Sequence, residues 1–261
     1  MTDDTMPTRT ERDGDDTRRG SRRGSRRGSR RRRRGGIKLF IRDIVIIIVV
    51  AVLASFLIKT FLIRSFYIPS ASMENTLQIN DRIIVNELTP DLVPLKHGDV
   101  VVFTDPGGWL PPHISPPLNP LAATVDGALS LVGLSTSDSD DHLIKRVIGL
   151  PGDHVACCNT LGQLTVNGVP LKEPYIIVPP GQVDSAAVTF NVTVPKGDMW
   201  VMGDNRYDSQ DSSRNQSLPG KGFVPIKDVV GRAILISWPA SRWSWLDNYP
   251  GVFAGVDRGG K

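Results

Sequence analysis

The distribution of apolar and polar residues divides this chain into three unequal parts. Residues 1–36 contain almost no apolar side chains, residues 44–63 contain almost nothing else, and the remainder alternates short apolar runs with Gly, Pro, Asn and Asp. A long continuous apolar run is typical of a membrane helix, whereas short runs rich in Val and Ile between turn residues are typical of β-strands. The pattern therefore predicts a polar tail, one membrane anchor and a mainly β body.

The apolar run from Ile44 to Ile63 has the length of a membrane span. Twenty helical residues cover about 30 Å, which is the thickness of the hydrocarbon core of a bilayer. The one charged residue of the run, Lys59, lies near its end, where the amine can reach the headgroups. The alternative is a cleaved signal peptide, but the apolar region of such a peptide is usually about 7–15 residues long. We therefore predict a single uncleaved transmembrane anchor over residues 37–64.

The polar tail, residues 1–36, is rich in Arg, Gly and Ser and has too little apolar surface to fold, so we predict that it is disordered. Residues 1–43 hold 15 of the 31 Lys and Arg but 7 of the 27 Asp and Glu, a charge of +8 that leaves −4 for the rest. Basic residues before a span favour a cytoplasmic tail at the plasma membrane, contact with anionic lipid headgroups and an extracytoplasmic body. A membrane adaptor whose tail binds RNA or another partner is the alternative. The acidic body itself is not typical of a nucleic-acid binder.

The body, residues 65–261, is predicted to consist mainly of strands. The predicted strands cover residues 82–86, 99–103, 143–149, 154–158, 164–166, 188–194, 199–202 and 229–238. Asn167-Gly168 predicts a tight hairpin turn after the fifth of them. Residues 104–141 are rich in Pro, Gly, Ser and Asp and form a predicted insertion, with one short helix over residues 121–134.

Cysteine and histidine offer little sign of a metal site. The two cysteines are adjacent, Cys157-Cys158, and the four histidines lack the spacing of metal ligands. Whether the cysteines are paired is left open by the sequence. We expect neither a metal nor another cofactor.

Two polar residues in apolar surroundings are candidates for catalysis. Ser72 follows Pro69, which fixes the backbone, and Ser70, whose hydroxyl can help to bind an oxyanion. Lys145 lies within an apolar strand, where loss of water disfavours the ammonium form and can make the amine a base. A strand lysine that simply reaches solvent is the plainer alternative for Lys145. No Ser/His/Asp triad is evident, so we hypothesise that Ser72 and Lys145 form a nucleophile–base pair.

A third segment, residues 203–214, is dense in Asp, Asn, Ser and Arg and predicts a hydrogen-bonded loop. Its carboxylates and hydroxyls are of the kind that can orient a lysine amine. A calcium loop is a weak alternative, because the spacing does not match that of an EF-hand.

Together these blocks resemble the bacterial type I signal peptidase family over residues 40–238. The motifs that carry the resemblance are Pro69-Ser70-Ala71-Ser72-Met73, Lys145-Arg146-Val147 and Gly203-Asp204-Asn205-Arg206. The resemblance implies a membrane-bound serine endopeptidase that cleaves signal peptides from exported preproteins after small residues at −1 and −3. It also implies a β-rich catalytic core with a secondary β extension. The expected partners are such preproteins and the phospholipid bilayer, with no nucleic acid, and we expect a monomer.

The resemblance also implies roles for individual residues. Ser72 is the nucleophile, Lys145 is the general base, and the Ser70 hydroxyl contributes to the oxyanion hole. The supporting residues are Ser209, which orients the lysine, Asp211, Asp204 and Arg206. The implied substrate-binding residues are Phe66, Ile68, Pro69, Met73, Leu77 and Ile144.

The chain departs from the family pattern at several positions. Ala71 replaces a commoner Gly, and His142 and Leu143 replace residues that border the pockets. The run Asp211-Ser212-Ser213-Arg214 contains one residue more than the usual Asp-Ser-Arg, which leaves the role of Arg214 open. A self-cleaving repressor with the same Ser/Lys chemistry is a further alternative, but the membrane span and the lack of a helix-turn-helix pattern count against it.

Overall fold

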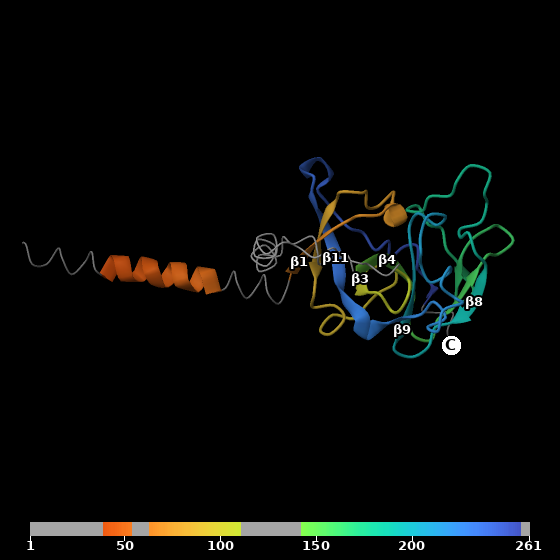
Figure 1. The fold of residues 1–261 in the computed structure, drawn as a ribbon, viewed down its shortest axis with the longest axis horizontal. Helices are drawn as coiled ribbons and strands as arrows, with labels where there is room; N and C mark the ends of the chain where they lie inside the picture. The colour runs from red at the N-terminus through yellow and green to blue at the C-terminus, as the bar shows by residue number, and fades with distance from the viewer. Residues whose placement is uncertain (1–38, 54–62, 111–141, 257–261) are drawn as a thin grey trace, which may run out of the picture. The chain divides into compact units, whose positions relative to one another are not determined.

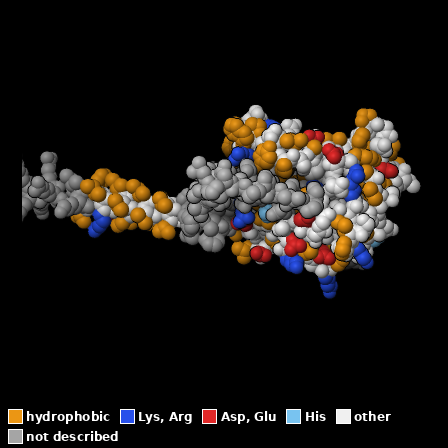
Figure 2. Space-filling model, viewed as in Figure 1, with side chains coloured by type: hydrophobic (Ala, Val, Ile, Leu, Met, Phe, Trp, Pro, Cys, Tyr) orange, Lys and Arg blue, Asp and Glu red, His pale blue; other side chains and the backbone are white. Residues whose placement is uncertain are grey.

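The computed structural model describes residues 39–53, 63–110 and 142–256. The predicted tail, residues 37–38 and 54–62 of the predicted anchor, and most of the predicted insertion lie outside the described residues. Residues 39–53 form a helix that is exposed along its whole length, and hydrophobic side chains cover it (Figure 2). Among the described residues, no helix is both long enough and apolar enough to cross a membrane. The anchor therefore stays a prediction.

The body contains two antiparallel sheets (Figure 1). The larger sheet has the strand order β1-β2-β11-β3-β4-β9-β10, with β12 paired to β11. Its strands are β1 (Ile63–Tyr67), β2 (Arg82–Asn86), β3 (Val100–Thr104), β4 (His142–Gly149), β9 (Asp198–Met202), β10 (Val224–Pro225), β11 (Val229–Trp238) and β12 (Ser244–Trp245). The smaller sheet has the order β7-β6-β5-β8. Its strands are β5 (His154–Cys157), β6 (Thr165–Val166), β7 (Val169–Pro170) and β8 (Phe190–Thr193).

Most of the predicted strands are confirmed. β2 and β11 have the predicted bounds, and the other six differ from the prediction by no more than two residues at either end. Asn167 and Gly168 both have positive φ, as the tight hairpin turn requires. The predicted anchor extends too far, because Ile63 and Arg64 belong to β1 and pair with β2. The apolar run passes into this strand without a break, so hydropathy alone does not mark the boundary.

The larger sheet is buried on both faces, which determines the environment of the site. On β3, Val100 and Val102 face one hydrophobic cluster, while Val101 and Phe103 face another. β4 lies between β3 and β9, and its residues 145–149 are all buried. Successive side chains of a strand point to opposite faces. Lys145 and Arg146 are therefore both removed from water, on opposite sides of the sheet.

Candidate active site

Ser72 lies in a short turn that the hydrophobic core holds in place. After β1 the chain is extended at Ser70 and then forms a single 3₁₀ turn, η1 (Ala71–Met73). Ile68 and Met73, on either side, are buried in the cluster beneath the sheet. The turn is closed by the Glu74 backbone N–H, which donates to the Ala71 carbonyl at 2.9 Å, and the Leu77 N–H donates to the Met73 carbonyl at 2.8 Å in the turn that follows. Because the core fixes both ends of the turn, the Ser72 side chain has a defined position.

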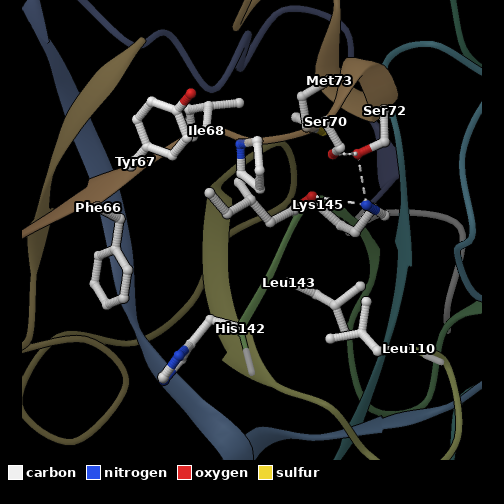
Figure 3. A pocket seen from close by; sticks show the side chains of 12 residues that line it. Phe66, Tyr67, Ile68, Ser70, Ser72, Met73, Leu110, His142, Leu143 and Lys145 are labelled. Carbon is white, nitrogen blue, oxygen red and sulfur yellow. Dashed lines mark hydrogen bonds between the residues drawn. The ribbon is translucent and has the colours of Figure 1, made fainter. Parts of the chain in front are cut away.

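Lys145 reaches Ser72 from the facing strand β4. Its Nζ donates to Ser72 Oγ at 2.8 Å and to the Ile144 carbonyl at 3.0 Å (Figure 3). The residue is 3 % exposed, and burial lowers the pKa of its amine to about 8, against the opposing effect of the negative charges of Asp211 and Asp204. An amine with this pKa is partly neutral near physiological pH. It can therefore accept the proton of the serine hydroxyl.

Ser70 supplies the second hydroxyl that the sequence predicts. Its Oγ lies 3.3 Å from Ser72 Oγ, and the side chain is exposed beside the buried pair (Figure 3). The structure thus brings Ser70, Ser72 and Lys145 together although Lys145 is 73 positions from Ser72 in the sequence. A substrate carbonyl placed over Ser72 Oγ has a hydroxyl donor within reach.

An apolar cavity of about 220 Å³ adjoins these residues (Figure 3). It is lined by Phe66, Tyr67, Ile68, Pro69, Ser70, Ser72, Met73, Leu110, His142, Leu143, Ile144 and Lys145. Five of the six predicted substrate-binding residues are among them. The sixth, Leu77, does not line the cavity but is fully buried in the core with Met73. Leu110 was not predicted, because it lies in a Pro- and Gly-rich segment whose sequence gives no sign that it lines a cavity.

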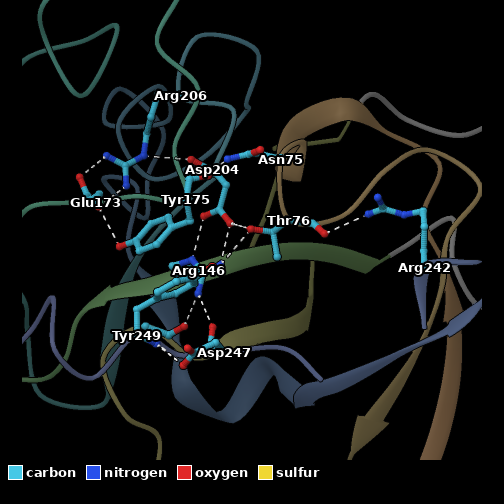
Figure 4. Close-up of polar contacts among 12 residues, drawn as sticks. Asn75, Thr76, Arg146, Glu173, Tyr175, Asp204, Arg206, Arg242, Asp247 and Tyr249 are labelled. Carbon is cyan, nitrogen blue, oxygen red and sulfur yellow. Dashed lines mark hydrogen bonds and ion pairs between the residues drawn. The ribbon is translucent and has the colours of Figure 1, made fainter. Parts of the chain in front are cut away.

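The loop at 203–214 is bound directly to the turn that carries Ser72. The Asn205 backbone N–H donates to the Ser72 carbonyl at 3.1 Å, and its side-chain amide donates to the Ala71 carbonyl at 3.3 Å. The Asp204 carboxylate accepts from Arg146 Nε at 2.8 Å and from Arg146 Nη2 at 2.7 Å (Figure 4). Asp204 also accepts a hydrogen bond from Thr76. The loop therefore joins the Ser72 turn to the back of β4.

Arg146 is the most enclosed cation near the site. It is 0 % exposed, donates to the Gly98 and Asp247 carbonyls as well as to Asp204, and its guanidinium lies 4.1 Å from the ring centre of Tyr175. In the sequence, Arg146 appears only as part of the motif Lys145-Arg146-Val147, with no role of its own. The signal that marks it is its position in a strand whose two faces are both apolar, where a charge needs a partner.

Arg206 supports the same loop through a second buried ion pair. Its guanidinium contacts the Glu173 carboxylate, and it also donates to the Gly203 and Ser185 carbonyls (Figure 4). Burial alone would lower the pKa of Arg206, but the Glu173 carboxylate raises it above its ordinary value. Glu173 was not predicted, because it lies in a separate loop and only the folded chain brings it to Arg206.

Asp211 and Ser209 also lie close to the pair, although their contacts differ from those that the resemblance implies. Asp211 accepts from the Gly203 and Ser213 backbone N–H groups at 3.0 Å each and from Ser213 Oγ at 2.7 Å. Ser209 is buried, but its Oγ has no hydrogen-bond partner among the described residues. The predicted contact that orients Lys145 is thus not formed within the part of the chain that the structure describes. Instead, the Ile144 carbonyl holds the amine.

Comparison with known proteins gives a consistent family assignment. Residues 41–238 match the family described as signal peptidase, peptidase S26. Signal peptidase I of Mycobacterium tuberculosis is 40 % identical over 220 residues, which are 78 % of this chain and 74 % of that protein. The probable signal peptidase I of Mycobacterium leprae is 37 % identical over 228 residues, 77 % of each chain. This chain therefore belongs to the S26 signal peptidase family, and it has the mainly β fold of that family.

More distant relatives have the same description. The probable signal peptidase I-1 of Synechocystis is 33 % identical over 210 residues, 80 % of this chain and 89 % of that protein. Among solved structures, a crystal structure of a signal peptidase I from Enterococcus faecalis matches, and its sequence is 23 % identical to this chain. The match has a TM-score of 0.32 and covers 53 % of this chain and 95 % of the Enterococcus chain. The assignment rests on the sequence relatives.

Proposed function

We propose that this protein is a membrane-bound signal peptidase in which Ser72 is the nucleophile and Lys145 the general base. The observation that carries the proposal is the 2.8 Å contact between a desolvated lysine amine and the Ser72 hydroxyl. Within the described part of the chain, no carboxylate forms an ion pair with Lys145. Burial of an unpaired ammonium is costly, which favours the neutral form of the amine. A peptidase that relies on a lysine base needs that neutral form.

The reaction follows from the positions of these groups. The neutral Lys145 amine accepts the proton of Ser72 while Oγ adds to the scissile carbonyl carbon. The oxyanion that forms receives hydrogen bonds from the Ser70 hydroxyl and the Ser72 backbone N–H. The Lys145 ammonium then protonates the leaving amine as the peptide bond breaks, which leaves an ester on Ser72. Water, deprotonated by the same amine, hydrolyses this ester and releases the signal peptide.

Substrate selection is assigned to the apolar cavity, with small residues at −1 and −3. Ile68, Met73 and Ile144 form its walls, and a wall of this kind excludes bulk through overlap. Ile144→Ala should therefore admit larger residues such as Val at −1 or −3, while the chemistry at Ser72 persists. Mass spectrometry of the products from a panel of such substrates measures the change. If Ile144→Ala cleaves the panel at the same sites as wild type, Ile144 does not determine substrate specificity.

The bilayer is assigned as a partner of the enzyme. The substrate's own apolar segment lies in the membrane, so an anchored peptidase meets it there. The described helix at 39–53 is apolar apart from Arg42 and Asp43 at its start. In the body, Trp238, Trp243 and Trp245 are 59 %, 69 % and 74 % exposed. Exposed Trp is enriched at membrane interfaces, which supports contact between this end of β11 and the headgroups.

The decisive experiment is cleavage of a preprotein by the purified full-length protein in detergent. Wild-type protein should release the signal peptide, whereas Ser72→Ala and Lys145→Ala should each abolish turnover without loss of fold. The double variant should be no worse than either single one, because the two residues act as a unit. A Lys145→Ala enzyme that keeps a substantial fraction of the wild-type rate would refute the assignment of the base. If the protein is instead an adaptor that binds through its tail, neither the wild-type protein nor any variant should cleave the preprotein.

A further inference from the structure

A second cavity meets the apolar one at Ser72 and Lys145. Its volume is about 310 Å³. The two cavities share the walls Ser70, Ser72, Leu110, Leu143 and Lys145. The second one is otherwise lined by Ala71, Trp109, Tyr207, Asp208, Ser209, Gln210 and Arg214. The reacting atoms thus lie at the junction of two cavities with different walls.

The different walls suit the two halves of a substrate. A peptide whose scissile carbonyl lies over Ser72 Oγ must continue in both directions from that point. The apolar cavity suits the small residues on the acyl side. The second cavity, which unlike the first is lined in part by the polar loop of 207–214, then lies where the residues after the scissile bond must pass. These are the first residues of the mature protein.

Arg214 is one of the residues that line this second cavity. The Asp211 carboxylate is occupied by Gly203 and Ser213 and makes no ion pair with Arg214. The Arg214 side chain is exposed at the cavity instead, and its Nη2 donates to the Tyr207 carbonyl at 2.6 Å. Among the described residues no carboxylate lies within 4.0 Å of this guanidinium, although Asp208 lines the same cavity. The loop thus holds an anchored cation with further donors available.

We propose that this second cavity binds the first two residues of the mature chain, +1 and +2, and that Arg214 selects an acidic side chain there. A guanidinium presents several N–H donors in a fixed plane, which matches the two oxygens of a carboxylate. One hydrogen bond to the Tyr207 carbonyl fixes the group and leaves the other donors for substrate. Arg214 is thereby a specificity-determining residue on the leaving side of the bond. This inference rests on the proposed function.

The test is a peptide series with constant residues up to −1 and variation only at +1 and +2. Glu, Gln and Lys are compared at each position with full-length enzyme in detergent, and kcat/KM is measured at low and at high salt. Wild-type enzyme should prefer Glu to the isosteric Gln at one of the positions by roughly fivefold, as for a partly exposed ion pair. The preference should shrink at high salt, because the pair is not fully buried.

Variants identify the residue responsible. Arg214→Gln should bring the ratio of kcat/KM for the Glu peptide to that for the Gln peptide close to one, and Arg214→Glu should prefer Lys. The matched control is Lys196→Gln, which removes the same charge from an exposed turn that lines neither cavity. It should keep the wild-type preference. If Lys196→Gln loses the preference for Glu as Arg214→Gln does, the overall positive charge of the protein is responsible for the preference and Arg214 is not.

The possible failures are distinguishable. If wild-type enzyme cleaves the Glu, Gln and Lys peptides equally well, the inference about the second cavity is wrong and the proposed peptidase function stands. If wild-type enzyme cleaves none of the peptides, nor a preprotein, the proposed function fails and this inference fails with it.

Discussion

At the scale of single residues, the environment of Lys145 decides what the serine can do. A hydroxyl has little nucleophilicity until a base takes its proton, and an ordinary surface lysine is charged at neutral pH. Here burial in β4 removes water from the amine and lowers its pKa to about 8. The same burial provides the short contact to Ser72. The strand that desolvates the proposed base is thus the strand that positions it.

The pH dependence of activity follows from this pKa. In the proposed mechanism only the neutral amine accepts the serine proton, so kcat/KM should rise with pH and level off above about 8. The direction is fixed by the sign of the shift, since burial disfavours the ammonium form. Initial rates between pH 6 and 10 on a peptide without titratable residues measure the profile. An activity that falls over this range, or rises only near the ordinary lysine pKa, would contradict a desolvated base.

Gly203 gives a second prediction at this scale. A Cβ built on it would lie 2.2 Å from Ser209 Oγ and 2.4 Å from the Ser72 carbonyl oxygen. Gly203→Ala must therefore push the loop away from the Ser72 turn, and we expect kcat to fall about 100-fold or more, as small misplacements of reacting groups do. Gly220→Ala is the matched control, because its nearest neighbour would be at 3.6 Å. Equal activity of the two variants would show that the close approach is unimportant.

At the scale of elements, the sequence predicts strands well where their ends are marked. β2 and β11 have turn residues at their boundaries, and their predicted bounds are confirmed. β1 is hidden in a longer apolar run, while β10 and β12 have two residues each and give no periodicity. The motifs predicted Ser70, Ser72 and Lys145 as one site. Glu173 and Leu110 were not predicted, because their roles depend on loops that only the tertiary fold brings to the site.

The ion pair between Glu173 and Arg206 connects two loops distant in sequence, and its loss should be costly. The side chains are 1 % and 0 % exposed, so Glu173→Gln leaves a buried guanidinium without its counter-ion. We expect the free energy of unfolding to fall by about 3–5 kcal/mol. Urea titration followed by fluorescence measures it.

The control for this prediction is a partly exposed ion pair at the β1 edge of the larger sheet. Arg64 and Glu87 have side chains that are 41 % and 17 % exposed, so Glu87→Gln should cost only about 0–1 kcal/mol. If the two substitutions cost the same, burial of the Glu173 pair does not contribute in the way proposed.

At the scale of the whole molecule, charge and hydropathy are distributed unevenly along the chain. Residues 1–43 hold 15 of the 31 Lys and Arg, and the apolar run follows directly. Apolar residues occupy almost every position of the described helix at 39–53 and are exposed, unlike in an amphipathic helix, which has a polar face. Figure 2 shows such side chains on the face in view. A segment of this kind is stable in contact with lipid. Both features support an anchored enzyme with its tail in the cytoplasm.

The last prediction concerns this topology. Basic residues before a span are retained on the cytoplasmic side, so the body should face outward. Protease added to intact spheroplasts should digest the body and leave a fragment that contains the arginine-rich tail and the anchor. Antibodies against a tag before residue 1 and against the body distinguish the two parts, and lysed spheroplasts are the control in which both parts are accessible. Protection of the body and digestion of the tail would invert the orientation. Ser72 and Lys145 would then lie on the side of the membrane where exported preproteins have not yet been translocated.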